Sequence, residues 1–463
     1  MERTEETMQF GLRLALAPLA ACAAIALALW ANLPPSPAAT AGKTAFDLAR
    51  AQATVADVAR APHPVGSAEH ARVRDAVAAN LRALGLAVEI QSGFGVRQGT
   101  RGDHAIAAAP VDNIIAVLPG RDRAAPAVAV MAHYDSVPYA PGAADDAAGV
   151  AAVLETARVM SASAPPARDV IFLVTDSEEM GLLGAQLFYK HHPLAARVGI
   201  VVNADTRGAK GRAIMFQTSP GNAALIDLWA RNAVSPTGNS LTNAIYRLLP
   251  NDTDMSVSLA AGKAGINSAF IDGQFDYHAP SDAPANLDPG TLQHQGQFAL
   301  AMTQALANAR ALPAQGADAV YFDVFSLAVV RYPPALGWAL TAVAGVLLVL
   351  LHLRWKLGWR SLWGTLGVLA LTVAAGGACH ALGAVIWPDY TIGMRERLAE
   401  APAAFWAWLA LCFGAVLAAK PGRALWFGAL VVLIALTAAS QIWLPGGGWL
   451  FGWPLLAALL IAA

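Results

Sequence analysis

The feature that most constrains this chain is a series of apolar stretches in its C-terminal third. Beyond residue 332 the chain carries only ten charged residues, and five apolar stretches lie near residues 335–353, 362–387, 402–419, 424–443 and 449–463. Each approaches the roughly 20 residues that a helix needs to cross a bilayer. Five successive stretches rich in Leu, Ala, Gly and Trp argue against buried helices of a soluble domain. We therefore predict that residues 316–463 form a multispanning α-helical membrane region of about five helices. The chain ends inside the last stretch, as it would in a fragment of a longer protein.

A further apolar run covers residues 11–33 and is interrupted only by Arg13 and Pro18. It is long enough to span a bilayer. The alternative is a cleavable signal peptide, for which an Ala-x-Ala site can be read near Ala39. The run is long for the apolar core of a signal peptide. We therefore favour an uncleaved transmembrane anchor with a cytoplasmic tip within residues 1–40.

The positions of Lys and Arg predict the orientation of the chain in the membrane, because loops rich in these residues stay in the cytoplasm. Arg354, Lys356 and Arg360 cluster after the first C-terminal stretch, and Lys420 and Arg423 follow two stretches later. Both loops should therefore be cytoplasmic. The polar segment before the first stretch should lie on the other side, in a periplasm or an organelle lumen.

Composition excludes several classes of protein. Charged residues make up 14% of the chain and the net charge is −1, and without a Lys/Arg tract we expect no nucleic-acid partner. The three cysteines, Cys22, Cys379 and Cys412, all lie in apolar runs. The polar segment therefore has neither a disulfide framework nor a thiolate metal site. A transporter is disfavoured because the apolar stretches contain few ionisable groups, His380 being the clearest.

The polar segment, residues 41–315, alternates between short β-rich runs and helical patterns. The expected strands are residues 113–118, 127–132, 169–175, 199–203, 213–217 and 268–271. The expected helices are residues 147–161, 181–191, 223–233 and 291–310. This alternation predicts an α/β fold with a largely parallel sheet between helices.

Acids and histidines follow several of these strands, and ligand sites of open α/β sheets gather at strand ends. Each residue alone would more often cap a helix or a turn. Capping does not readily explain why all of them occur together, in this order, at the ends of strands. The candidate metal ligands are His133, Asp145, Glu179, Asp205 and His278. Imidazoles and carboxylates are the ligands that Zn²⁺ takes when thiolates are absent. Glu178 remains as a base for a metal-activated water, and Asp135 is placed to accept the second N–H of His133.

The stretches AHYDSVPYAPGAADDAAGVAAVLE, TDSEEMGLLGA, NADTRG and FDYHAPSDAPANLD resemble the M28 family of zinc exopeptidases, as does the earlier APHPVGSAEH. The arrangement of N-terminal helix, polar domain and multispanning C-terminus is similar to that of membrane metallopeptidases of the endoplasmic reticulum and vacuole. The resemblance implies a zinc-exopeptidase-like mixed, mostly parallel sheet.

The resemblance also implies a metal site with two Zn²⁺ ions, for which Co²⁺ or Mn²⁺ could substitute. His133 and Asp205 would hold one ion, Glu179 and His278 the other, and Asp145 would bridge them. Glu178 would be the general base and later the acid. Tyr277 would stabilise the oxyanion, and Asp135 would support His133.

The expected function is that of a membrane-bound metallopeptidase that hydrolyses peptides or proteins as an exopeptidase, with an aminopeptidase favoured. The alternatives are a carboxypeptidase or dipeptidase of the same family, a single-zinc glutaminyl cyclase, and an inactive membrane scaffold or receptor. One residue has two interpretations at this level: Arg207 could bind a substrate carboxylate or pair with the loop of Asp205.

Overall fold

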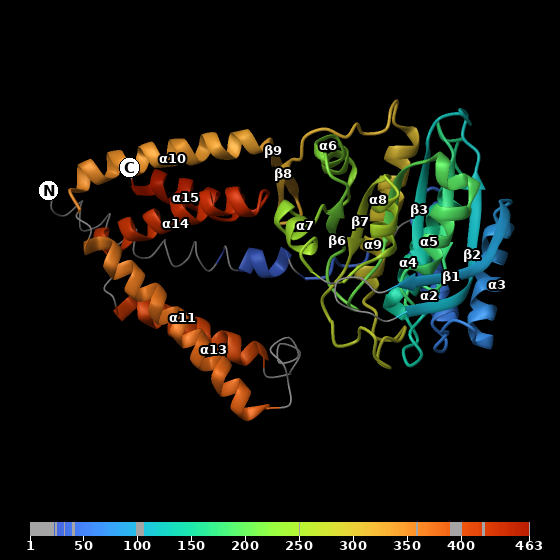
Figure 1. Cartoon of the computed structure of the whole chain (residues 1–463), viewed down its shortest axis with the longest axis horizontal. Coiled ribbons are helices and arrows are strands. Elements are labelled where there is room, and N and C mark those ends of the chain that lie inside the picture. Colours follow the sequence, from blue (N-terminus) through green and yellow to red (C-terminus); the bar gives the residue numbers. More distant parts are fainter. Residues whose placement is uncertain are drawn as a thin grey trace. The chain divides into compact units, whose positions relative to one another are not determined.

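The computed structural model describes residues 23, 26–31, 33–38, 42–98, 106–249, 251–357, 360–388, 401–418 and 422–462. The chain divides into two compact units (Figure 1). The first comprises Met1–Asp318 and Phe322–Arg331, and the second Ala319–Tyr321 and Tyr332–Ala463. Most of the anchor expected within residues 1–40 lies outside the described residues.

A seven-stranded sheet with the order β1-β2-β4-β3-β5-β7-β6 forms the centre of the first unit (Figure 1). Its strands are β1 (Ala87–Gln98), β2 (Ile106–Leu118), β3 (Ala127–His133), β4 (Val170–Thr175), β5 (Val198–Ala204), β6 (Ile214–Thr218) and β7 (Ala264–Ala269). The four central strands β4, β3, β5 and β7 run parallel, whereas β1, β2 and β6 are antiparallel to their neighbours. The predicted mixed α/β fold with a largely parallel centre is confirmed.

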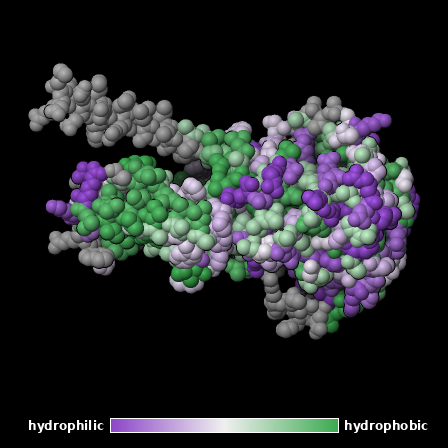
Figure 2. Space-filling model, turned by 90° about the horizontal axis from the view of Figure 1, so that it is seen from above, coloured by the Kyte–Doolittle hydropathy of each residue, from purple (hydrophilic) through white to green (hydrophobic). Residues whose placement is uncertain are grey.

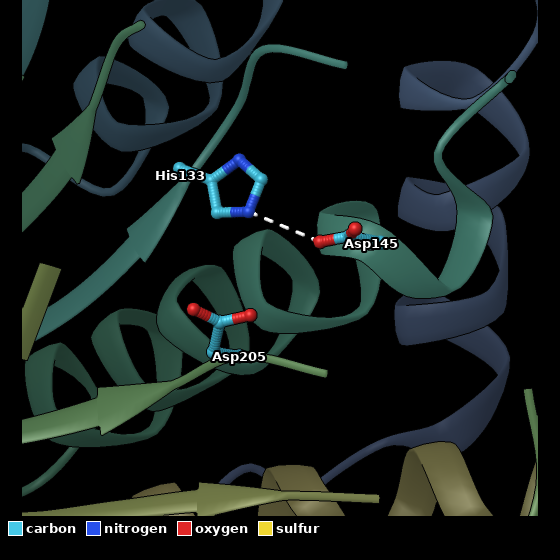
Figure 3. Close-up of side chains that lie close together, drawn as sticks. All are labelled: His133, Asp145 and Asp205. Carbon is cyan, nitrogen blue, oxygen red and sulfur yellow. Dashed lines mark hydrogen bonds and ion pairs between the residues drawn. The ribbon is translucent and has the colours of Figure 1, made fainter. Parts of the chain in front are cut away.

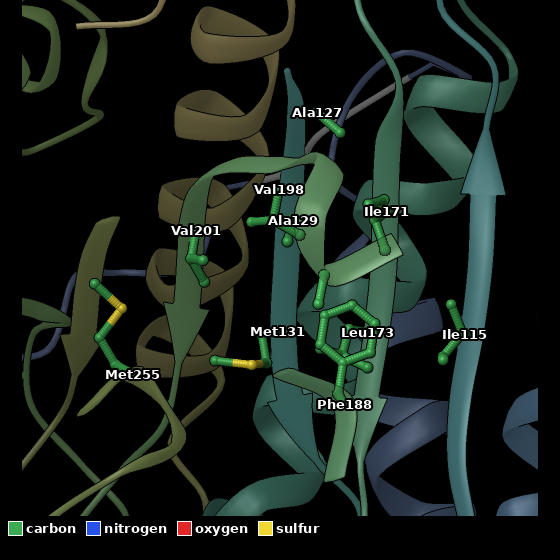
Figure 4. Close-up of a cluster of buried hydrophobic side chains, with 11 residues drawn as sticks. Ile115, Ala127, Ala129, Met131, Ile171, Leu173, Phe188, Val198, Val201 and Met255 are labelled. Carbon is green, nitrogen blue, oxygen red and sulfur yellow. The ribbon is translucent and has the colours of Figure 1, made fainter. Parts of the chain in front are cut away.

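The central strands are buried on both faces, which explains why β3 and β4 are almost continuously apolar. Alternate residues point to opposite faces. Ala129 and Met131 of β3 pack with Phe188 and Met255 in one cluster, drawn in Figure 4. Those two partners belong to α5 (Leu183–His191) and α8 (Asp254–Ala260), so these helices cover one face.

Helices α4 (Gly149–Ser161) and α9 (Pro289–Asn308) pack against β3 and against each other, and α2 (Leu48–Val58) packs on both. The remaining helices of the unit are α3 (Ala68–Ala83), α6 (Ala223–Asn232) and α7 (Ser240–Tyr246). Side chains cap several of them: Ser67 accepts from the N–H of His70, and Asp288 accepts from the N–H of Thr291.

One expected strand is displaced in the structure. Residues 268–271 were expected to be extended, whereas β7 runs from Ala264 to Ala269. The sequence of β7, AGINSA, lacks the continuous apolar pattern of a buried strand because Asn267 and Ser268 are polar. Asn267 is nevertheless fully buried, since its amide donates to Gln217 and Thr253.

The second unit consists of α10 (Pro334–Trp355), α11 (Arg360–Ile386), α13 (Ala401–Ala418), α14 (Arg423–Trp443) and α15 (Trp449–Ala462), which correspond to the five predicted stretches. A short pair of strands, β8 (Val320–Val324) and β9 (Ala328–Tyr332), precedes it in the sequence. Among the described residues, three helices are long and apolar enough to cross a membrane: Pro334–Trp355, Leu362–Ile386 and Arg423–Trp443.

The helices of the second unit expose apolar side chains on their outer surface. Val346, Val385 and Trp443 are 61%, 77% and 79% exposed, and hydrophobic residues dominate the visible surface of these helices in Figure 2. Inside, α10, α14 and α15 share a small apolar cluster that includes Leu348, Leu430 and Leu455. Exposed apolar surface of this extent is typical of helices that face lipid.

The first unit should lose stability in acid through His294. The Nδ1 atom of this buried histidine accepts the N–H of Ala213 at 3.0 Å, so its Nε2–H donates to Val234 and Ser235. Burial lowers the pKa of His294 from 6.5 to about 4. The unfolded chain therefore binds a proton more readily between these values, and stability falls as the pH drops below about 6.5. Between pH 7.5 and 5 the loss should be about 2 kcal/mol.

Urea unfolding of the full chain in detergent, read by pulse proteolysis of the first unit, measures this effect. The His294→Gln variant should lose less stability than the wild type over the same pH range. An equal loss in both proteins would contradict the assignment, because all other titrating groups are common to the two.

Candidate metal centre

The predicted ligands meet at the carboxyl edge of the parallel strands. His133 is the last residue of β3, Glu179 follows β4, and Asp205 follows β5 directly. Asp145 lies in η1 (Ala143–Ala148), the turn that leads into α4. Figure 3 shows His133, Asp145 and Asp205 approaching one another from three different elements. His278 reaches the same place from the loop after β7.

Two groups of ligand atoms form at this edge, and Asp145 belongs to both. His133, Asp145 and Asp205 offer atoms within 4.8 Å of one another, and so do Asp145, Glu179 and His278. The two oxygens of Asp145 face different histidines: Oδ1 is 3.2 Å from His133 Nε2, and Oδ2 is 3.1 Å from His278 Nε2. A carboxylate that divides its oxygens in this way has the geometry of a bridge between two cations.

The chemistry of this donor set fits divalent cations. Burial, together with the charge of Asp145, raises the pKa of Glu179 to about 7, and burial raises that of Asp205 to about 6. Glu179 Oε1 is also buried without a hydrogen-bond partner among the described residues. Buried carboxylates that lack enough donors are costly unless a cation compensates them. Three carboxylates and two imidazoles without a thiolate suit Zn²⁺, and also Co²⁺ or Mn²⁺.

Glu178 lies beside this centre but belongs to neither group of ligand atoms. Burial, and then the charges of Asp205 and Glu179, raise its pKa well above the usual value, while His133 opposes the shift. A carboxyl group with a raised pKa that is not used as a ligand is suited to proton transfer.

Asp135 has a task in addition to the one expected. The Nδ1 atom of His133 is closer to the backbone oxygen of Asp135, at 3.1 Å, than to its carboxylate, at 3.5 Å. The carboxylate instead accepts the backbone N–H groups of Glu178 and Glu179, at 2.9 and 3.1 Å. Asp135 therefore ties the loop after β4 to the end of β3, and its carbonyl and its carboxylate both lie close to the Nδ1 atom of His133.

Two further acids hold the loop of Asp145, and the sequence analysis assigned them no role. Asp282 accepts the N–H groups of Ala144 and Asp145 at 2.7 and 3.2 Å. Asp146, joined to Asp145 by a cis peptide bond, accepts the N–H groups of His133 and Gly149. The position of Asp282 four residues after His278, in a segment already singled out, was the one signal that could have identified it.

Tyr277 and Arg207 lie at the side of the centre. The ring of Tyr277 stacks on that of its neighbour His278, with centroids 3.8 Å apart and an interplanar angle of 17°. Burial, with the charges of Asp145 and Glu179, raises the pKa of Tyr277, so its hydroxyl stays protonated and can donate. The guanidinium carbon of Arg207 lies 5.4 Å from the centroid of the Tyr277 ring.

The sequence of this unit was compared with families of known proteins. Residues 113–303 match the family model of peptidase family M28. This segment is an M28-family domain. Endoplasmic reticulum metallopeptidase 1 of Mus musculus is 32% identical over 255 residues, which are 53% of this chain and 28% of that protein. A vacuolar membrane protease of Clavispora lusitaniae is 31% identical over 264 residues, which are 54% of this chain and 25% of that protein. The chain thus spans about a quarter of the length of these M28 relatives.

Solved structures with a related chain path include an aminopeptidase from Aneurinibacillus sp. strain AM-1. It is 15% identical and has a TM-score of 0.47, and the match covers 59% of this chain and 97% of that one. A glutaminyl cyclase from Porphyromonas gingivalis is 21% identical with a TM-score of 0.45, and the match covers 56% and 98% of the two chains.

Replacing Asp135 by Ala should destabilise the first unit, because two buried N–H groups lose their acceptor. The expected loss is about 2–4 kcal/mol. Asp122→Ala is the matched control, since Asp122 also accepts two backbone N–H groups, those of Ala124 and Ala125, but at an exposed position where water can replace it. Urea unfolding with a chelator present compares the two variants. Equal losses in both would contradict the role given to Asp135.

Proposed function

We propose that this chain is a membrane-bound di-zinc exopeptidase, and specifically an aminopeptidase. The observation that carries the proposal is the position of Asp145, whose two oxygens face the two histidines of separate ligand groups. His133 and Asp205 would complete one zinc site, and Glu179 and His278 the other. All five side chains are present, which disfavours an inactive scaffold.

In the proposed reaction, Glu178 takes a proton from the attacking water and later gives it to the leaving amine. Bound zinc would supply Lewis acidity to the water and to the scissile carbonyl. The raised pKa of Glu178 suits this exchange. Tyr277 would donate its hydroxyl proton to the carbonyl oxygen as negative charge develops there. Asp135 would fix the position of Glu178 through the backbone of its loop.

We propose removal of N-terminal residues as the activity. A free α-amine carries a positive charge, which local carboxylates that do not ligate metal would bind. A carboxypeptidase or a dipeptidase would use the same metal chemistry and would differ only in which terminal group of the peptide the site binds. A glutaminyl cyclase would need a single zinc ion.

Glu178→Gln should abolish turnover while leaving the metal centre intact. The amide cannot accept the proton of the attacking water, so kcat should fall by about 10²–10⁴-fold. The measurement is hydrolysis of a peptide library by the full chain in detergent, read by mass spectrometry with and without chelator. Glu89→Gln is the control, because Glu89 is an exposed residue of β1 whose side chain is 62% accessible.

Zinc content measured on the same preparations separates the alternatives. The wild type and Glu178→Gln should both bind two zinc ions per chain, and Asp145→Ala should bind neither. One zinc ion in the wild type would favour cyclase chemistry, and no zinc would favour the scaffold. Near wild-type turnover by Glu178→Gln would remove Glu178 from the mechanism.

We also propose that the peptidase domain is extracytoplasmic and that the chain crosses the membrane several times. The support is the basic cluster around the connection between α10 and α11, with Arg354, Lys356 and Arg360, since clusters of this kind stay in the cytoplasm. The curated relatives are named for the endoplasmic reticulum and for the vacuolar membrane, which is consistent with a domain in a non-cytoplasmic compartment.

Cysteine labelling should place the two sides of α10 in different compartments. In a background without the three native cysteines, Gln315→Cys should react with a membrane-impermeant maleimide in right-side-out vesicles. Leu357→Cys, which keeps the neighbouring basic residues, should react only after the vesicles are opened. Labelling in the reverse pattern would overturn the proposed orientation.

A further inference from the structure

Arg207 is the basic residue that the sequence left with two interpretations. It lies two residues after the candidate ligand Asp205, where the chain leaves β5. Its backbone is held in place, because its N–H donates to the carbonyl of Phe270 at 3.0 Å. The next residue, Gly208, packs so closely on the backbone of Asp272 that any Cβ there would clash. The loop therefore presents Arg207 from a fixed position.

The side chain of Arg207 is partly buried and rests on the face of Tyr277, with 5.4 Å between the guanidinium carbon and the ring centroid. It makes no ion pair with Asp205 or with any other carboxylate that the structure describes. Arg72 and Arg158, which are also partly buried, contact acids. Arg212 resembles Arg207 in that it lies over an aromatic ring, that of Trp30, and makes no ion pair with a described carboxylate. Among the described residues, the side chain of Arg207 therefore does not pair with the loop of Asp205.

An arginine in this position has unused binding capacity. A guanidinium cation presents five N–H donors in a planar fork that matches a carboxylate. The aromatic face of Tyr277 stabilises the cation, but it accepts none of the in-plane hydrogen bonds. A partly buried charge without such partners is costly, so the arrangement favours an anionic ligand.

We propose that Arg207 binds a carboxylate of the substrate, either the C-terminal carboxylate of a short peptide or an acidic side chain close to the scissile bond. This inference rests on the proposed peptidase function and narrows its substrate class. Arg207 would then add a positive side chain to a site rich in carboxylates. The site would select peptides by their carboxylate as well as by their α-amine.

The path from Arg207 to the metal centre limits the length of such a substrate. The guanidinium carbon lies 5.4 Å from the centroid of the Tyr277 ring, and that centroid lies 3.8 Å from that of the His278 imidazole. The two separations together set an upper limit on the distance from Arg207 to His278. An extended peptide advances about 3.3–3.6 Å per residue, so this limit corresponds to at most about two or three residues. Dipeptides and tripeptides with a free C-terminus would place their carboxylate within reach.

The test compares acid and amide forms of the same peptide with the full chain in detergent. Leu-Leu should have a kcat/KM about 10- to 100-fold higher than that of Leu-Leu-amide, as for a charge-assisted hydrogen bond. Without a cation at Arg207, acid and amide should be hydrolysed at similar rates, because bound zinc compensates the charge of the ligand carboxylates. Leu-Glu-amide against Leu-Gln-amide distinguishes an acidic side chain from the C-terminal carboxylate as the bound group.

Variants of Arg207 test whether this residue causes the preference for the acid form over the amide form. Arg207→Gln should bring acid and amide to within about 3-fold of each other, mainly through KM, with zinc content unchanged. Arg207→Lys should restore part of the preference, because it restores the charge without the planar fork. Arg82→Gln, at an exposed position in the last turn of α3, should behave as the wild type. A structural or general electrostatic role for Arg207 would lower the rates of acid and amide equally and would overturn the proposal.

Binding gives a readout that does not need turnover. Calorimetry with zinc-loaded Glu178→Gln should give a lower Kd for Leu-Leu than for Leu-Leu-amide, and the difference should vanish when Arg207→Gln is added. Equal Kd values for the two peptides would overturn the inference. Wild-type hydrolysis of both forms at equal rates would also overturn it while leaving the proposed function in place. Failure to hydrolyse any peptide would overturn the proposed function, and the binding experiment would still decide the role of Arg207.

Discussion

The first unit depends on the concentration of buried carboxylates at one edge of its sheet. Asp145, Glu179 and Asp205 converge there with only two imidazoles among the candidate ligands. Each carboxylate has been removed from water, and their mutual repulsion raises the pKa of Glu179 further. Divalent cations bound there would offset both costs. The same buried carboxylates therefore account for the arrangement of the loops and for the affinity proposed for metal ions.

The acids around the centre carry out two kinds of task. Some present oxygen atoms to the space between His133 and His278, whereas Asp135, Asp146 and Asp282 direct theirs to backbone N–H groups. A carboxylate that accepts two N–H groups holds a loop more firmly than a neutral side chain could. The candidate ligands are therefore positioned by acids of their own type, and this explains why so many carboxylates occur in one region.

Much of the fold could be predicted because its central strands are buried on both faces. β3 and β4 are short, apolar and continuous, and α9 was expected as a long helical stretch. The strand β1 and the helices α2, α3, α7 and α8 were missed, and β7 was displaced, because their sequences mix polar with apolar residues. Such segments become ordered through tertiary partners, as the amide of Asn267 does between Gln217 and Thr253.

The sequence by itself determined the order of the candidate ligands along the chain and the apolar character of the C-terminal helices, since both are properties of residue type and spacing. It could not decide what a charged side chain contacts. The tertiary structure decided that the carboxylate of Asp135 accepts from the loop of Glu178 while it lies beside His133. It also left Arg207 on the ring of Tyr277 without an acidic partner among the described residues. Such pairings depend on distances between segments far apart in the sequence, which only the packing of the sheet and its loops can set.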